Sequence, residues 1–264
     1  MTRIGQLFDV LRQENRKGFI AYLTAGDPSP ERTPALVEAL ERGGADLIEL
    51  GVPFSDPIAD GPVIQRAGER ALHAGTNLRK VLEIACQIRR RSQLPLLLFT
   101  YLNPVLRYGL EELARDAAAA GIDGCLLTDV SVEEAGEYVD VMHRHDLDTV
   151  FLAAPTSTDR RLELLAKFSS GFVYLVSRTG VTGERDSLST MAAPLVERVR
   201  RVTSLPLALG FGIARPEHVT EAARQADAVV VGSAIVRLIE EHGGDADLEL
   251  RLEDFIRSLK KGIA

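Results

Sequence analysis

Residues 47–61 read LIELGVPFSDPIADG. The first part of this stretch predicts a short buried strand over residues 46–51, and Glu49 stands near the carboxyl end of that strand. A loop rich in Pro, Gly and Asp follows and supplies a second carboxylate, Asp60. Burying a carboxyl group in an apolar strand costs free energy unless the group is paired with a cation or takes part in catalysis. The two acids therefore indicate proton-transfer chemistry.

The same unit, a short apolar strand followed by a helix, recurs on both sides of this stretch. We expect eight strands, at residues 18–24, 46–51, 95–101, 124–128, 149–153, 172–176, 206–209 and 228–231. We expect helices at residues 34–42, 62–73, 78–90, 109–120, 131–145, 158–168, 188–202, 216–224, 233–241 and 248–261. An extra amphipathic helix precedes the first strand, because Ile4, Leu7, Phe8 and Leu11 recur at helical spacing.

This alternation indicates an α/β fold with a parallel sheet. Strands that are apolar at nearly every position are buried on both faces, and strict alternation with helices gives right-handed βαβ units. Eight such units favour a (β/α)8 TIM barrel, which typically needs about 250 residues. The chain has 264 residues and no linker, so we expect a single domain over residues 1–264.

The composition narrows the function classes. The net charge of −7 argues against a nucleic-acid partner, and the longest apolar run, residues 94–102, is too short to cross a membrane. The N-terminus has no apolar signal segment, and Cys86 and Cys125 have no disulfide or ligand spacing. We therefore expect a cytoplasmic protein that acts on a small molecule.

Two kinds of catalytic site are disfavoured by residue placement. No lysine falls at the end of a predicted strand, which argues against a Schiff-base aldolase. His143 and His145 are two residues apart and do not share a helix face, so we expect no metal site.

In a barrel of this kind the active face lies at the carboxyl ends of the strands. Alternation places Glu49 and Leu47 on one side of their strand and Ile48 and Leu50 on the other. If Glu49 points into the barrel mouth, burial raises its pKa and fits it for acid/base work, although a strand-end salt bridge is the alternative. Asp60 precedes a glycine, so an ordinary surface turn remains an alternative for it.

Glycine clusters follow the last three predicted strands, at residues 180–183, 210–212 and 232–233. Glycine lets backbone N–H groups approach an anion, and the last cluster opens a helix whose amino end favours negative charge. These positions indicate a phosphate site, although glycines also simply close turns.

Aromatic and apolar residues near the same face could line a pocket for a flat apolar group. Ordinary packing inside the barrel is the alternative for each of them. The candidates are Tyr22, Phe99, Tyr101, Leu126, Tyr174 and Phe211.

The chain resembles the tryptophan synthase alpha subunit family in several motifs that run in order along nearly its whole length. The first is residues 47–65, LIELGVPFSDPIADGPVIQ, and the second is residues 174–183, YLVSRTGVTG. Further matches are Thr24–Pro28, Tyr101–Pro104, Ala154–Ser157 and Gly210–Ile213. The resemblance implies a TIM barrel lyase that cleaves indole-3-glycerol phosphate to indole and glyceraldehyde 3-phosphate, in the last steps of L-tryptophan biosynthesis.

The resemblance also implies roles for individual residues. It places the catalytic glutamate on Glu49 and the catalytic aspartate on Asp60, with Tyr174 in the active site and Thr182 on a mobile loop that contacts the aspartate. It implies phosphate contacts at Gly183, Gly212, Ile213, Gly232 and Ser233.

A partner is implied as well. Family members dock on a tryptophan synthase beta chain in an alpha2-beta2 heterotetramer, with contacts from residues 53–60 and the region of Pro104. The pyridoxal phosphate belongs to that beta chain, so this chain should need no cofactor. A phosphosugar isomerase or epimerase, a free-standing indole-releasing lyase and a non-catalytic binding subunit are the competing interpretations.

Overall fold

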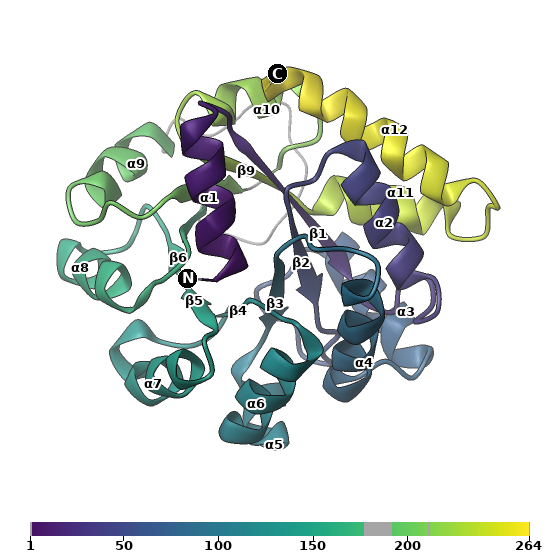
Figure 1. Cartoon of the computed structure of the whole chain (residues 1–264), viewed down its shortest axis with the longest axis horizontal. Helices are drawn as coiled ribbons and strands as arrows, with labels where there is room; N and C mark the ends of the chain where they lie inside the picture. The colour runs from purple at the N-terminus through teal and green to yellow at the C-terminus, as the bar shows by residue number, and fades with distance from the viewer. Residues whose placement is uncertain (1, 177–191, 211, 264) are drawn as a thin grey trace.

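The computed structural model describes residues 2–176, 192–210 and 212–263. Within these residues the strands form one parallel sheet in the order β5-β4-β3-β2-β1-β9-β8-β7-β6, which curls into a barrel surrounded by helices (Figure 1). The strands are β1 (Gly18–Thr24), β2 (Leu47–Gly51), β3 (Leu96–Thr100), β4 (Gly124–Leu127), β5 (Asp148–Val150), β6 (Leu152–Ala153), β7 (Val173–Val176), β8 (Leu207–Gly210) and β9 (Ala228–Val231). The expected (β/α)8 barrel is confirmed.

The helices follow the strands in the chain. The first half holds α1 (Arg3–Gln13), α2 (Thr33–Gly43), α3 (Pro62–His73), α4 (Leu78–Arg89), α5 (Leu102–Tyr108) and α6 (Leu110–Ala120). The second half holds η1 (Val132–Glu134), α7 (Gly136–Arg144), α8 (Asp159–Phe168), α9 (Ala192–Arg200), α10 (Pro216–Ala223), α11 (Ser233–His242), α12 (Leu248–Lys260) and η2 (Lys261–Ile263). No helix of the described ranges is long and apolar enough to cross a membrane.

The barrel closes through a single segment that changes partners at Phe151. We predicted one strand over residues 149–153, but the structure divides it into β5 and β6. β5 pairs only with β4, whereas β6 pairs only with β7. The Phe151 carbonyl accepts the Tyr174 N–H at 3.1 Å, so the two short strands together occupy one position in the ring.

Two further differences from the predicted elements have local causes. We did not predict α5, because its Asn103-Pro104 pair is typical of a loop. In the structure Pro104 lies in the first turn of α5, where the missing backbone N–H of proline is tolerated. The predicted helix over residues 131–145 is interrupted at Ala135, which ends η1 and precedes α7. Residues 188–191 of another predicted helix lie outside the described residues.

The core has two layers, as strand alternation requires. Ile48 and Leu50 face the surrounding helices, whereas Leu47 faces the inside of the barrel. The inner layer also contains the apolar face of α1, which covers the amino ends of the strands. The Phe8 and Phe172 rings pack with centroids 5.7 Å apart, and Figure 1 shows α1 inside the ring of the other helices. The inside of the barrel is therefore filled by side chains at its amino end.

We expect Phe8→Ala to lower the free energy of unfolding by about 3–5 kcal/mol, because it removes a buried ring from the inner core. Val10→Ala on the same helix is the matched control, since Val10 is 44% exposed, and should change stability by less than about 0.5 kcal/mol. Urea denaturation of both variants measures the difference. Equal effects would show that α1 does not plug the barrel.

Candidate active site at the carboxyl ends of the strands

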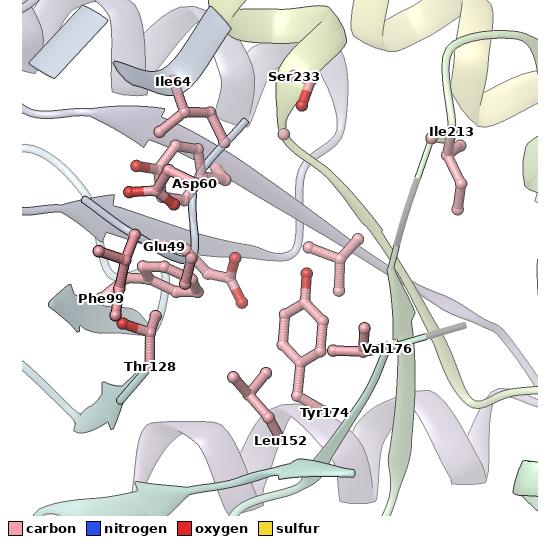
Figure 2. Close-up of a pocket in the computed structure, with 16 residues that line it drawn as sticks. Glu49, Asp60, Ile64, Phe99, Thr128, Leu152, Tyr174, Val176, Ile213 and Ser233 are labelled. Carbon is pink, nitrogen blue, oxygen red and sulfur yellow. The ribbon is translucent and has the colours of Figure 1, made fainter. Parts of the chain in front are cut away.

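A cavity of about 360 Å³ opens at the carboxyl end of the barrel, within the size range of small-molecule sites (Figure 2). Strand ends and the loops after them supply its wall. The lining residues are Tyr22, Glu49, Ile58, Ala59, Asp60, Ile64, Phe99, Thr128, Leu152, Tyr174, Val176, Gly212, Ile213, Val230, Gly232 and Ser233. Both candidate acids and part of the candidate phosphate site therefore share one cavity.

Glu49 lies on the inner side of β2, where it is level with Tyr22 of β1 and Leu97 of β3. Its side chain points into the cavity and is only 1% exposed (Figure 2). Its Oε1 atom has no hydrogen-bond partner, and no cation pairs with Glu49 among the residues that the structure describes. Because burial disfavours the charged form, the pKa of Glu49 rises to about 8.

Asp60 ends the loop that follows β2, immediately before the Gly61-Pro62 start of α3. It is 8% exposed, so it does not merely close a surface turn. The Tyr101 hydroxyl donates a hydrogen bond of 2.9 Å to the Asp60 carboxylate, and the Ala59 N–H donates to the Tyr101 oxygen at 3.1 Å. Gln65 Nε2 donates to the Asp60 carbonyl at 2.9 Å, which holds the loop against α3.

The two acids differ in protonation because their surroundings differ. Burial raises the pKa of Asp60 to about 6, and the hydrogen bond from Tyr101 opposes that rise by stabilising the charged form. Near neutral pH the site therefore combines a largely protonated Glu49 with a largely ionised Asp60. Pairs of carboxyl groups whose pKa values are separated in this way can divide acid/base and electrostatic roles between them.

The opposite side of the cavity suits an anion. Gly212 adopts a left-handed φ of 70°, which favours glycine, and Ile213 follows it. α11 begins at Ser233, and its N-cap residue Gly232 provides no side-chain cap. The first N–H groups of a helix have no partner within the helix, and they carry the positive end of its dipole. Figure 2 shows Ile213 across the cavity from Glu49 and Asp60.

The aromatic candidates occupy different positions. Tyr22, Phe99 and Tyr174 line the cavity, and the Tyr22 and Phe99 rings meet edge to face at 5.2 Å. Tyr101 is not among the lining residues and instead supports Asp60. Leu126, which we also expected in the pocket, packs in the inner core and is not among the lining residues, whereas Thr128 is.

Three predicted site residues, Thr182, Gly183 and Phe211, lie outside the described residues. Sequence reasoning did not select several residues that line the cavity, including Leu152, Val176 and Val230. Strand alternation could have found these three, because each occupies an inward position near the end of its strand. Ile58 and Ile64 carry no such signal, since they come from the loop and helix after β2.

Glycines at two strand ends make room for the tyrosines of the wall. The Tyr22 ring lies across Gly51, and the Tyr174 ring lies across Gly210. A Cβ atom at either glycine would overlap the hydroxyl end of the tyrosine, so both positions exclude larger residues unless the ring moves. The missing side chains of Gly51 and Gly210 therefore determine where the Tyr22 and Tyr174 rings lie in the cavity wall.

Comparisons with known proteins show which family the chain resembles. A family model described as "Tryptophan synthase alpha chain" matches residues 8–263. The tryptophan synthase alpha chain of Solibacter usitatus (strain Ellin6076) is 73% identical over 99% of this chain and 98% of its own length. That of Geotalea uraniireducens (strain Rf4) is 48% identical over 100% of this chain and 98% of its own length.

Solved structures extend the similarity to the backbone. A structure of Mycobacterium tuberculosis tryptophan synthase has a TM-score of 0.92 and 40% identity, covering 99% of this chain and 98% of that chain. A crystal structure of tryptophan synthase subunit alpha from Legionella pneumophila has a TM-score of 0.90 and 35% identity, covering 100% and 98%. From the match along the chain and the shared barrel, we conclude that this protein belongs to the tryptophan synthase alpha chain family.

Proposed function

We propose that the chain is a carbon–carbon lyase that cleaves indole-3-glycerol phosphate to indole and glyceraldehyde 3-phosphate. The observation that carries the proposal is the buried Glu49 carboxyl, whose Oε1 atom has no hydrogen-bond partner and which shares its cavity with Asp60. An isolated buried acid is retained only at a cost in stability, so a catalytic use explains its position. The helix start across the cavity supports a substrate with a phosphate at one end.

In the proposed complex the phosphate binds backbone N–H groups near Gly212, Ile213, Gly232 and Ser233, with Gly183 as a further candidate contact. The indole ring lies between the apolar walls that include Phe99 and Leu152. Binding of the phosphate supplies free energy away from the reacting bond. That free energy orients the bond toward the acids.

The first step transfers the Glu49 proton to C3 of the indole ring. The ring nitrogen becomes positively charged as a result, and the N–H group then donates a hydrogen bond to ionised Asp60. A carboxylate in a cavity of low polarity stabilises this charge more than water would. Glu49 is left as a carboxylate with the glycerol chain beside it.

In the second step Glu49 takes the proton from the hydroxyl group next to the ring. The bond between the ring and the chain breaks, its electron pair returns to the indole and neutralises the nitrogen, and an aldehyde forms on the phosphate-bearing fragment. Glu49 ends the cycle protonated, as it began. The chain needs no cofactor of its own for these proton transfers.

We further propose that the chain works with a tryptophan synthase beta chain in an alpha2-beta2 complex, and that the pyridoxal phosphate belongs to that beta chain. Two exposed apolar residues support a protein contact beside the active site. Ile58 of the loop after β2 is 77% exposed and Leu106 of α5 is 63% exposed. Exposed apolar side chains of this size are available for contact with a partner protein.

Glu49→Gln should lower kcat by about 100-fold or more with little change in KM, because it removes the transferable proton and keeps the shape. Glu83→Gln, at an exposed glutamate of α4, is the matched control and should leave both constants unchanged. The measurement is indole release by the purified chain. Near-normal turnover by Glu49→Gln would refute the assignment, and release of no indole by the wild type would favour a phosphosugar isomerase or a binding subunit.

The burial of Glu49 has its own test in stability. Its pKa is about 8 in the fold against an ordinary 4.5, so the unfolded chain ionises first and wild-type stability falls between pH 5 and pH 8. Relative to Glu49→Gln, the wild type should lose up to about 1.4 kcal/mol per pH unit. Urea denaturation of both proteins at pH 5 and pH 8 measures this. A difference that stays constant with pH would mean that Glu49 is solvated.

The pH profile of kcat/KM should be bell-shaped. Asp60 must be ionised, so the rate rises through pH about 6, and Glu49 must be protonated, so it falls through pH about 8. Tyr101→Phe removes the bond that favours ionised Asp60 and should move the acidic limb to higher pH without moving the basic limb. An acidic limb that stays in place would mean that Asp60 does not control it.

A further inference from the structure

Four charged side chains join three segments on the outside of the barrel, and we call this group the α3–α11 clamp. Arg70 of α3 binds Asp27 through two hydrogen bonds of 2.8 Å, from Nε and Nη2. Its remaining nitrogen, Nη1, donates to Glu240 of α11 at 2.9 Å. Arg66, one turn earlier on α3, also binds Glu240 through two bonds, of 2.7 and 2.8 Å. Each carboxylate is thus held by two or more bonds from α3.

The α3–α11 clamp is anchored in the protein interior. Asp27 lies in the loop after β1 and is only 1% exposed, so the chain fixes one end of the network rigidly. The two arginines hold the pKa of Glu240 down to about 2, which keeps Glu240 charged over the working range. The planar guanidinium of Arg70 suits this bridging position, since its fork binds one carboxylate on two atoms and still reaches another.

The two clamped helices carry opposite ends of the candidate site. α3 begins two residues after Asp60, and α11 begins at Ser233 in the anion-binding wall. Arg70 and Glu240 lie eight and seven residues into these helices, about 10–12 Å behind their first residues at 1.5 Å per residue. Ile64 of α3 and Ser233 of α11 both line the cavity, and Figure 2 shows them toward the same end of it.

An apolar seam fills the space between the clamp and the cavity. Val63, Ile64 and Ala67 of α3 form one buried cluster with Val236 of α11 and Tyr22 of β1. The two helices therefore touch along the seam and are tied by ion pairs behind it. Contact and clamp together hold the amino ends of α3 and α11 at one separation.

We propose that Arg70 and Glu240 are positioning residues that fix the distance between Asp60 and the anion-binding start of α11. This inference rests on the proposed function, because it concerns a ligand that spans both ends of the cavity. Such a ligand binds well only when both ends are correctly spaced, since a misplacement of about 1 Å can cost up to about 100-fold in rate. The affinity for a ligand that touches only one end of the cavity does not depend on the distance between the two ends.

The test compares ligands that span the site with ligands that do not. The spanning probe is a non-cleavable analogue, an indole that carries a three-carbon chain ending in phosphate, and the single-end probes are inorganic phosphate and indole. Calorimetry should show Glu240→Ala binding the spanning probe about 10-fold more weakly, with the single-end probes within about twofold of the wild type. The kcat for cleavage should fall along with it.

Glu253→Ala is the matched control. Glu253 also accepts hydrogen bonds from two arginines, Arg42 of α2 and Arg257 of α12, but it joins helices that carry no site residue. It should bind all three probes like the wild type. Thermal melting of both variants checks that they remain folded.

The outcomes separate the two proposals. If Glu240→Ala binds the spanning probe as the wild type does, or loses inorganic phosphate to the same degree, the positioning role is overturned and the proposed function stands. If the wild type does not bind the spanning probe at all, the proposed function fails and the positioning role fails with it.

Discussion

The removal of water from the Glu49 carboxyl is the constraint on which the rest of the site depends. Burial of the Glu49 carboxyl, whose Oε1 atom has no hydrogen-bond partner, favours its neutral form. The carboxyl therefore remains a proton donor at pH values where an ordinary glutamate is ionised. Glu49 is buried because side chains alternate along β2. Glu49 faces inward like Leu47, but it lies two residues nearer the carboxyl end and reaches the cavity instead of the core.

Asp60 shows how a second acid in the same cavity is kept in the other state. Its donor Tyr101 follows β3, so the hydrogen bond joins the loop after one strand to the end of the next. The ring of Tyr101 also packs against Phe54 of the same loop, with centroids 5.2 Å apart. Tyr101 thus holds Asp60 in position and also favours the ionised form of its carboxyl group. Tyr22 and Tyr174, which line the cavity, make no such hydrogen bond to Asp60 among the described residues.

Sequence patterns predicted the fold well because parallel strands and amphipathic helices are encoded locally. β1, β9 and α3 match the predicted ranges, and the inward direction expected for Glu49 follows from a period of two. The partner change at Phe151 has no local signal, since it depends on how many strands close the ring. The sequence pattern also does not show how deep in the barrel an inward-facing residue lies. We therefore placed Leu126 in the cavity, whereas the residue that lines it is Thr128.

The hydrogen bond from Tyr101 to Asp60, which joins residues 41 positions apart, and the clamp that joins Asp27 to Glu240 could not be read from the sequence either. Their members are ordinary surface residue types until the helices are packed. Long-range polar contacts of this kind follow from tertiary geometry, whereas the periodicity of each element does not contain them.

The pairing of β1 with β9 has a consequence for when the site comes into existence. The acids come from the first quarter of the chain, whereas Gly232 and Ser233 come from its last part, and this pairing places β9 beside β1. During synthesis a ribosome releases Glu49 and Asp60 long before Gly232 and Ser233, which belong to the candidate phosphate site. A nascent chain consequently carries both acids before the candidate phosphate site exists, and the complete cavity forms when β9 docks beside β1.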